Sequence, residues 1–228
     1  MKLLVALSWR NIWRNKRRSL LTVAAVTFAA FLLVVFRGVA IGTWEYSLKN
    51  TVSLSSGFLQ IQRHGYRDNP SLNKSYRFPG NVESVVGSNP GVAGYAPRIT
   101  ADGLVSCRTN SSGTAILGID PRSEQNVSRF HQRIREGRMV NPNHPGEVVV
   151  GYKLLANLKA RVGDSLVVLA QGYDGVMGNQ RYRAVGTLRM GVPAFDASSV
   201  VMSLESAQQL LAMEGRVNVV AIATDEFE

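Results

Sequence analysis

The feature that most constrains this chain is an apolar run from Leu20 to Phe36, directly after a short basic cluster. The run carries no charge, and two threonines are its only polar residues. A helix rising about 1.5 Å per residue would make it roughly 25 Å long, near the length that crosses a hydrocarbon core of about 30 Å. Arg37 interrupts the pattern, but apolar residues follow it, and an arginine at a helix end can extend to the headgroups. We therefore predict one transmembrane helix over residues 19–42.

Positive charge in front of this run gives the predicted helix a direction. Every charged residue before Leu20 is a lysine or an arginine. An excess of these residues marks the cytoplasmic side of a membrane protein. We therefore expect the N-terminus in the cytoplasm and residues 43–228 outside it, as one large extracytoplasmic domain.

Residues 1–18 combine an apolar stripe with basic side chains and two tryptophans. Tryptophan favours the headgroup zone, and lysine and arginine favour anionic lipid. This pattern predicts a cytoplasmic amphipathic helix at the membrane surface, with a disordered basic tail as the alternative. The residues expected at the membrane interface are Trp9, Trp13, Arg14, Lys16, Arg17 and Arg18.

Two other classes of segment share some of these properties. A cleaved signal peptide has a shorter basic region than this one, and no Ala-x-Ala site follows the apolar run. A core helix of a soluble protein rarely has a charge-free surface all round over this length. Both alternatives are less consistent with the sequence than a membrane anchor.

The charge of the chain is concentrated near this anchor. The formal net charge is +10, and residues 1–44 contain no acidic residue. Membrane lipid is therefore the expected partner of the basic excess, and no nucleic acid is expected. Cys107 is the only cysteine, so no intrachain disulfide forms, and the outer domain depends on its packed core.

Beyond the anchor, short apolar runs alternate with turn residues and short helical patterns. A polar helical stretch over 43–56 is expected to continue the anchor. The order of elements predicts an α+β extracytoplasmic domain with a mixed sheet, short helices and two lobes. The predicted strands are 58–62, 92–99, 103–108, 115–119, 148–150, 165–170, 180–190, 198–203 and 217–223. The predicted helices are 81–88, 120–134, 153–158 and 203–213, with loops at 67–80, 172–178 and 191–195.

A set of short motifs occurs in a fixed order along this domain. Gly118-Ile-Asp-Pro121 comes first, Glu147-Val-Val-Val-Gly151 follows, and Val162-Gly-Asp164 comes after it. In order and spacing these motifs resemble the periplasmic core of MacB-like and FtsX-like ABC transporter permeases. The resemblance spans nearly the whole chain. The residues matching its motifs, all expected to be structural, are Gly118, Pro121, Glu147, Gly151, Gly163, Asp164, Gly186 and Asp196.

Residues 56–62 and 68–72 favour the lipoprotein-releasing branch of that family, which is LolC/LolE-like. The resemblance implies four transmembrane helices per permease, with the large outer domain between the first and the second. It also implies a bacterial inner-membrane location, with the main domain in the periplasm. The implied partners are an ABC ATPase subunit, a second permease subunit in a homo- or heterodimer, and a lipoprotein or other envelope substrate. Because the sequence ends at Glu228, about where the second helix is expected, we expect a fragment or a truncated gene.

Residues for catalysis are not expected in this chain. It has no phosphate-loop motif, and His64, His131 and His144 lack metal-ligand spacing. Cys107 is interpreted as a small structural thiol, and Asp164 and Asp196 as turn residues. We therefore predict no catalytic, cofactor-binding or metal site, and an ATPase on a separate chain.

Two other functions are consistent with part of the sequence. A single-pass membrane-anchored scaffold would use the outer domain to recruit an envelope partner. A membrane-bound hydrolase has no residue constellation to support it. The sequence does not choose between lipoprotein release, efflux and mechanical signalling.

Overall fold

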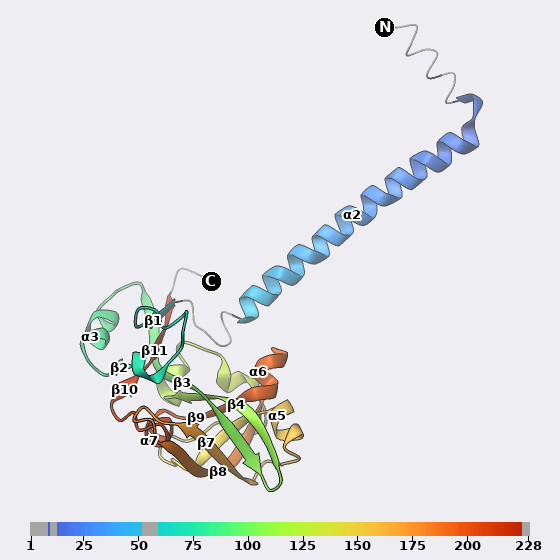
Figure 1. Cartoon of the computed structure of the whole chain (residues 1–228). Helices are drawn as coiled ribbons and strands as arrows, with labels where there is room; N and C mark the ends of the chain where they lie inside the picture. The colour runs from blue at the N-terminus through green and yellow to red at the C-terminus, as the bar shows by residue number, and fades with distance from the viewer. Residues whose placement is uncertain (1–8, 10–12, 52–58, 225–228) are drawn as a thin grey trace. The chain divides into compact units, whose positions relative to one another are not determined.

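The computed structural model describes Trp9 and residues 13–51 and 59–224. The chain divides into two compact units, residues 1–49 and residues 50–228 (Figure 1). The boundary between the units lies after Lys49, further along the chain than the boundary at residue 43 expected from the sequence. Most of the predicted interfacial helix over 1–18, and residues 52–56 of the helical stretch expected to follow the anchor, lie outside the described residues.

The first unit is built on one long helix, α2 (Lys16–Thr51). Within it, Lys16–Thr43 is long and apolar enough to span a membrane, and it is the only such helix among the described residues. The hydroxyl of Thr22 donates a hydrogen bond to the carbonyl oxygen of Arg18 at 2.9 Å, and that of Thr43 to Val39 at 2.7 Å. These polar groups are thus satisfied inside the helix, as hydrocarbon surroundings require.

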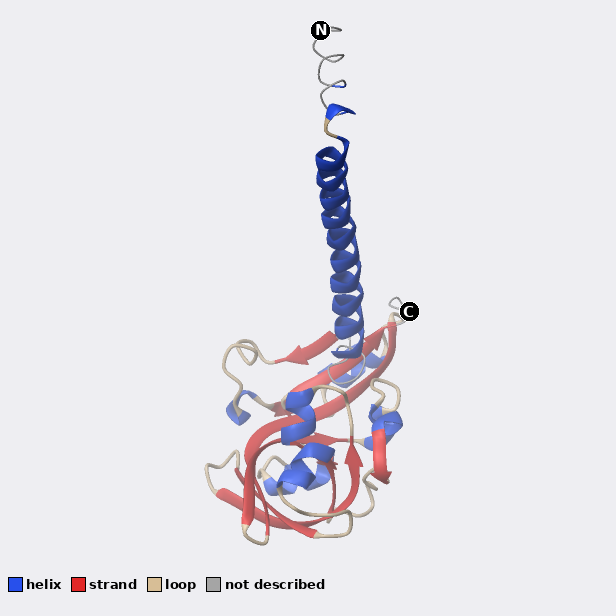
Figure 2. Ribbon diagram, turned by 90° about the vertical axis from the view of Figure 1, so that its right-hand side faces the viewer, coloured by secondary structure: helices blue, strands red, loops and turns tan. Residues whose placement is uncertain are grey.

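The second unit is organised by a mixed sheet of nine strands. The strands of this sheet are β1 (Leu59–Gln62), β3 (Val92–Cys107), β4 (Asn110–Ile119), β5 (Ile134–Gly137), β6 (Glu147–Gly151), β7 (Ser165–Gln171), β8 (Met177–Leu188), β9 (Ser199–Ser203) and β11 (Val219–Thr224). A separate two-stranded sheet pairs β2 (Tyr76–Arg77) with β10 (Arg216–Val217). Figure 2 shows the strands curving around the short helices.

Pairing between the strands closes a ring. From β3 the hydrogen bonds lead to β4, β9, β6, β8 and β7, and β7 pairs again with β3. Two of these pairings are parallel and the others antiparallel, which confirms the predicted mixed sheet. β11 and β1 extend the sheet beyond β3, and β5 pairs with β8 outside the ring. Residues 50–228 form one unit, so the two lobes expected from the sequence are not separate bodies.

The helices of this unit are short. They are α3 (Asn81–Gly87), α4 (Pro121–Glu124), α5 (Tyr152–Asn157), α6 (Pro193–Ser198), α7 (Leu204–Leu210), and two 3-10 turns, η2 (Leu72–Lys74) and η3 (Phe130–Arg133). Side chains alternate along a strand, so β6 supplies both sides of the sheet. Val148 and Val150 pack with Leu154 and Leu210 in the larger apolar cluster. Val149 packs with Phe130 in the second cluster.

Several predicted elements differ from the structure. The sequence predicts two strands, 92–99 and 103–108, where β3 is continuous from Val92 to Cys107. A side chain at Gly103 would overlap the carbonyl oxygen of Leu169 on β7. The glycine therefore lets the backbones of β3 and β7 approach closely within a continuous strand. α6 lies across a predicted loop, since Pro193 is favoured in the first turn of a helix.

The helix predicted over 120–134 is also shorter than expected. α4 ends at Glu124, and the chain then forms η3 and β5. Val127 and Phe130 pack into different apolar clusters, whereas residues three apart on a helix share one face. Packing to two sides therefore ends the helix early.

Candidate functional site

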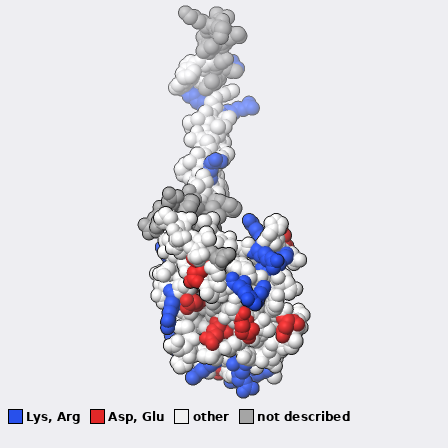
Figure 3. Space-filling model, turned by 90° about the vertical axis from the view of Figure 1, so that its left-hand side faces the viewer, with Lys and Arg blue, Asp and Glu red and all other residues white. Residues whose placement is uncertain are grey.

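The first set of predicted site residues lies just before α2 and in its first turn. The rings of Trp9 and Trp13 have centroids 6.3 Å apart, and Nζ of Lys16 lies 5.0 Å from the centre of the Trp13 ring. Both tryptophans are more than half exposed. Arg14, Lys16, Arg17 and Arg18 are exposed as well. Beyond them the surface of α2 carries little charge (Figure 3). Paired aromatic rings and exposed cations at a helix start suit a lipid headgroup region.

The motif turn at Gly163 and Asp164 leads from α5 into β7 and is hydrogen-bonded to β8. Gly163 has a φ of +102°, which favours glycine, and the carboxylate of Asp164 accepts a hydrogen bond from the backbone N–H of Arg161 at 2.9 Å. The N–H of Gly163 donates to Ala184 on β8, and the N–H of Ala184 donates to Asp164. The predicted turn is confirmed, and its role is to fix the start of β7 against β8.

Three motif glycines lie where another part of the chain comes close. A Cβ at Gly118 would overlap the Cβ of Ala207 on α7, and one at Gly151 would overlap the backbone of Asp196. A Cβ at Gly186 would overlap the carbonyl oxygen of Arg138. These glycines therefore allow helices and a neighbouring segment to pack directly on the sheet.

Asp196 is a buried carboxylate that holds a loop. Its side chain is 2 % exposed and accepts hydrogen bonds from the N–H groups of Met190 at 2.7 Å and Gly191 at 3.2 Å. Both donors belong to the segment that follows β8. Asp196 thus ties that segment to α6.

Of the remaining motif residues, Pro121 lines a groove of about 420 Å³ in the outer unit, and Glu147 pairs with Arg138 of its lining. Pro121 opens α4, whose N-cap Asp120 accepts hydrogen bonds from the next turn. Glu124 forms a buried ion pair with Arg98, with a closest N–O distance of 2.5 Å. The groove is lined by Pro121, Arg122, Glu124, Gln125, Phe130, His131, Arg138, Met139, Val140, Asn141 and Pro142.

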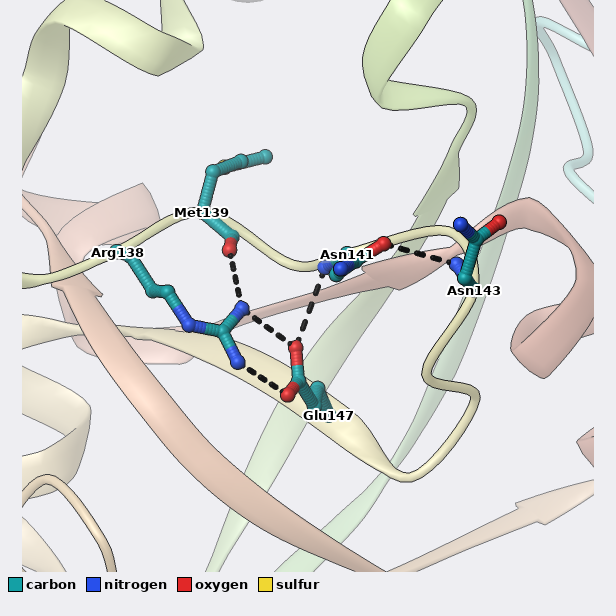
Figure 4. A network of polar contacts seen from close by, with 5 residues as sticks. All are labelled: Arg138, Met139, Asn141, Asn143 and Glu147. Atoms are coloured by element: carbon teal, nitrogen blue, oxygen red, sulfur yellow. Dashed lines mark hydrogen bonds and ion pairs between the residues drawn. The ribbon is translucent and has the colours of Figure 1, made fainter.

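A second arginine–carboxylate pair lies beside the same groove (Figure 4). Arg138 donates hydrogen bonds to both carboxylate oxygens of Glu147 and to the carbonyl oxygen of Met139 at 3.1 Å. The N–H of Asn141 donates to Glu147 at 3.2 Å, and Asn141 in turn accepts from the N–H of Asn143 at 3.0 Å. The hydrogen bond from Arg138 lowers the pKa of Glu147 and raises the pKa of Arg138.

The groove has the chemistry of a binding surface. Phe130 and Val140 are buried at its floor, and Arg122, Gln125 and His131 are exposed at its rim. Among the described residues, no group of three or more His, Cys, Asp or Glu residues is placed to hold a metal ion.

Sequence reasoning missed Arg98, the partner of Glu124. Its signal was an arginine inside an otherwise apolar strand pattern at 92–99. The structure places Cys107 in the core at 4 % exposure, consistent with a structural thiol.

Comparison with known proteins agrees with this architecture. The family model for the MacB-like periplasmic core domain matches residues 19–227. Two relatives from strains of Xylella fastidiosa, both named lipoprotein-releasing system transmembrane protein LolC, are 29% identical over 135 residues. Each match covers 56% of this chain and 32% of the relative. The chain therefore spans about a third of the length of these curated relatives.

Two solved structures share the fold. The extracellular domain of the noncanonic ABC-type transporter YknZ from Gram-positive bacteria matches 74% of this chain and 83% of its own, with a TM-score of 0.52 and 14% identity. The periplasmic region of MacB from Actinobacillus actinomycetemcomitans matches 76% of this chain and 78% of its own, with a TM-score of 0.51 and 10% identity.

Proposed function

The chain belongs to the family of MacB-like periplasmic core domains, and from this membership we propose that it is the N-terminal part of a permease subunit of an ABC transporter of the lipoprotein-releasing type. In this role, ATP hydrolysis on a separate cytoplasmic ATPase drives extraction or export of a lipoprotein or another envelope substrate.

One observation carries the proposal. The match to LolC includes more than half of this chain, and that relative is named for lipoprotein release. The likenesses to YknZ and MacB support the fold alone, because identity to them is low. The lipoprotein substrate is therefore inferred from LolC.

The proposed placement puts the N-terminus of α2 at the cytoplasmic face of the inner membrane and the outer unit in the periplasm. The exposed cations Arg14, Lys16, Arg17 and Arg18 support this orientation by the positive-inside rule. Trp9 and Trp13 would lie among lipid headgroups. The proposed partners are an ABC ATPase, a second permease subunit and membrane lipid.

The groove between the two ion pairs is the proposed contact surface of the outer unit for substrate or partner. It combines an apolar floor at Phe130 and Val140 with exposed Arg122 and His131. Grooves that join an apolar floor to a few polar groups are the usual form of binding sites. The proposed motif residues Pro121 and Glu147 then act indirectly, by shaping this groove.

Co-purification tests the transport role. The tagged product of the whole source gene, extracted in mild detergent, should bring down an ABC ATPase and a second permease chain. Depletion of the gene product should leave lipoproteins in the inner membrane. If no ABC ATPase co-purifies, the proposal is wrong. If the ATPase co-purifies but lipoproteins reach their destination, the efflux branch replaces lipoprotein release.

Orientation has a separate test. The triple variant K16E/R17E/R18E makes the basic cluster before the apolar segment acidic. It should therefore invert or mix the topology reported by fusions to the outer unit. The matched control is K159E/R181E/R183E, which changes three exposed basic residues of the outer unit and should leave the topology unchanged. Unaltered topology in the first variant would contradict the assigned orientation.

A further inference from the structure

Three basic side chains converge on the ring of Tyr152. The guanidinium carbon of Arg135 lies 5.0 Å from the ring centroid, that of Arg189 lies 5.6 Å away, and Nζ of Lys153 lies 6.0 Å away. All three are within the range of a cation–π contact. We call these four residues the Tyr152 cluster.

Three neighbouring strands position this cluster, because Tyr152 and Lys153 open α5 directly after β6 and Arg189 follows β8. β6 and β8 run parallel and end at the paired residues Gly151 and Leu188. Tyr152 follows β6 and Arg189 follows β8, so the two residues lie at the same edge of the sheet. Arg135 comes from β5, at a shift in register between that strand and β8. Such a bulge re-aims a side chain out of the regular alternation. The convergence is therefore fixed by backbone pairing.

The charges of the cluster are not neutralised within the described part of the chain. The ion pairs found there join Arg98 to Glu124 and Arg138 to Glu147, and neither involves the cluster. The guanidinium groups of Arg135 and Arg189 have ring contacts but no hydrogen bond to a described residue. The Debye length is about 8 Å at physiological salt, so charges gathered around one ring still repel one another. An anion bound among them would remove that repulsion.

We propose that the Tyr152 cluster binds a phosphate group. Two guanidinium forks match phosphate oxygens in a bidentate way, an ammonium adds a point charge, and the phenol hydroxyl of Tyr152 is a further donor. Because all the cations lie within 6.0 Å of one centroid, the site has the size of a single anion and not of an extended acidic peptide. The phosphate is either free in solution or part of an anionic lipid headgroup.

The surroundings favour recognition of the phosphate itself over burial of an acyl chain. Among the described residues of the outer unit, the exposed large apolar side chains are outside the cluster: Leu59, Val85, Leu104, Tyr173, Val176 and Met177. On the face drawn in Figure 3, basic and acidic side chains lie side by side. The Tyr152 cluster differs from such mixed surface because it gathers one sign of charge around one ring. This inference does not depend on the transport role.

The test uses the full chain in uncharged detergent and measures binding by calorimetry. The probes are inorganic phosphate, short-chain phosphatidylglycerol mixed into the micelles, and a glutamate-rich peptide. The R135Q/R189Q variant removes two exposed guanidinium groups. Its matched control is R181Q/R183Q, which removes the same charge from exposed positions of β8 outside the cluster. Circular dichroism checks that both variants are folded.

We expect R135Q/R189Q to weaken phosphate-probe binding roughly tenfold or more, because two charge-assisted contacts are lost, and R181Q/R183Q to change it by less than about twofold. Tyr152→Phe keeps the ring and should weaken binding only a few-fold. Binding of inorganic phosphate would identify a free-phosphate site, and binding of phosphatidylglycerol alone would identify a headgroup site.

Three results would overturn the proposal. Equal weakening in both double variants would mean that binding follows overall charge. Binding of the glutamate-rich peptide without either phosphate probe would assign the surface to a protein partner. No binding of any probe to the unaltered chain would leave the cluster without a phosphate ligand.

Discussion

The two arginine–carboxylate pairs beside the groove have the same chemistry and opposite surroundings. The side chains of Arg98 and Glu124 are each 3 % exposed, whereas those of Arg138 and Glu147 are 54 % and 14 % exposed. Burying a charge is costly unless its partner is present, while water screens an exposed pair. The first pair is therefore expected to make folding depend on both partners. The second pair positions the loop after β5. Its loss is expected to lower the free energy of unfolding only slightly.

Loss of one member of the buried pair should have the largest effect. Glu124→Ala leaves the charge of Arg98 without its buried carboxylate, and we expect a loss of about 3–5 kcal/mol in the free energy of unfolding. Arg138→Ala, at the exposed pair, should cost less than about 1 kcal/mol. Urea unfolding of the detergent-solubilised chain, followed by circular dichroism, measures both. Similar losses in the two variants would remove the distinction between the pairs.

Replacing both members of the buried pair sharpens the comparison. In R98M/E124L no charge is left unpaired, and the new methionine can pack on Phe130, over which the Arg98 guanidinium now lies at 5.8 Å. We expect stability within about 2 kcal/mol of the unaltered chain, well above Glu124→Ala. The same unfolding experiment compares them. A double variant less stable than Glu124→Ala would show that Arg98 stabilises the fold through other contacts.

A smaller effect is expected at the exposed pair. Glu147→Gln keeps the shape of the side chain and removes its charge. Because water screens Arg138, the free energy of unfolding should fall by only about 0.5–1 kcal/mol. That difference should shrink in about 1 M salt, where the Debye length is about 3 Å. Arg138→Gln is the matched control, because it breaks the pair from the other side. A salt-independent difference would mean that hydrogen bonds, not charge, dominate this pair.

The smallest effect is a pH dependence. The Arg138 hydrogen bond holds the pKa of Glu147 below its ordinary value of about 4.3, so the unfolded chain binds the proton more tightly than the folded one. The resulting stabilisation is present above about pH 4.3 and is lost as pH falls through the lower, folded-state pKa. The stability difference between the unaltered chain and Glu147→Gln should therefore narrow with acidification, as unfolding between about pH 6 and pH 3 will measure. A difference that widens on acidification would reverse the assigned direction.

Local signals in the sequence predicted the parts of the fold that depend on neighbours in the chain. The charge-free run predicted the membrane-spanning helix, three consecutive valines predicted the buried strand β6, and Gly163-Asp164 predicted the turn before β7. The family resemblance placed Glu147 and Asp196 in structural roles, and their hydrogen bonds support that interpretation.

Features that depend on distant partners were not predictable in this way. Arg98 meets Glu124 only because β3 passes beside α4. The Tyr152 cluster exists only because the start of β5 lies beside the ends of β6 and β8. The ring closes through the pairing of Ser106 with Val167, which no local pattern signals. Periodicity describes which side of a strand is buried, but it does not say which strand lies next to it.

The pairing of Leu59 with Ile222 determines how the outer unit would carry a mechanical load. The described unit begins at β1 and ends at β11, and these adjacent antiparallel strands bring its two ends together. Pulling the ends apart would break their hydrogen bonds one after another, as in a zipper. A pull on both ends together would instead be shared by the ring, in which every strand is bonded on two sides. The unit should thus resist a force applied to it as a whole, and the pairing of β1 with β11 should be the first part of the sheet to separate.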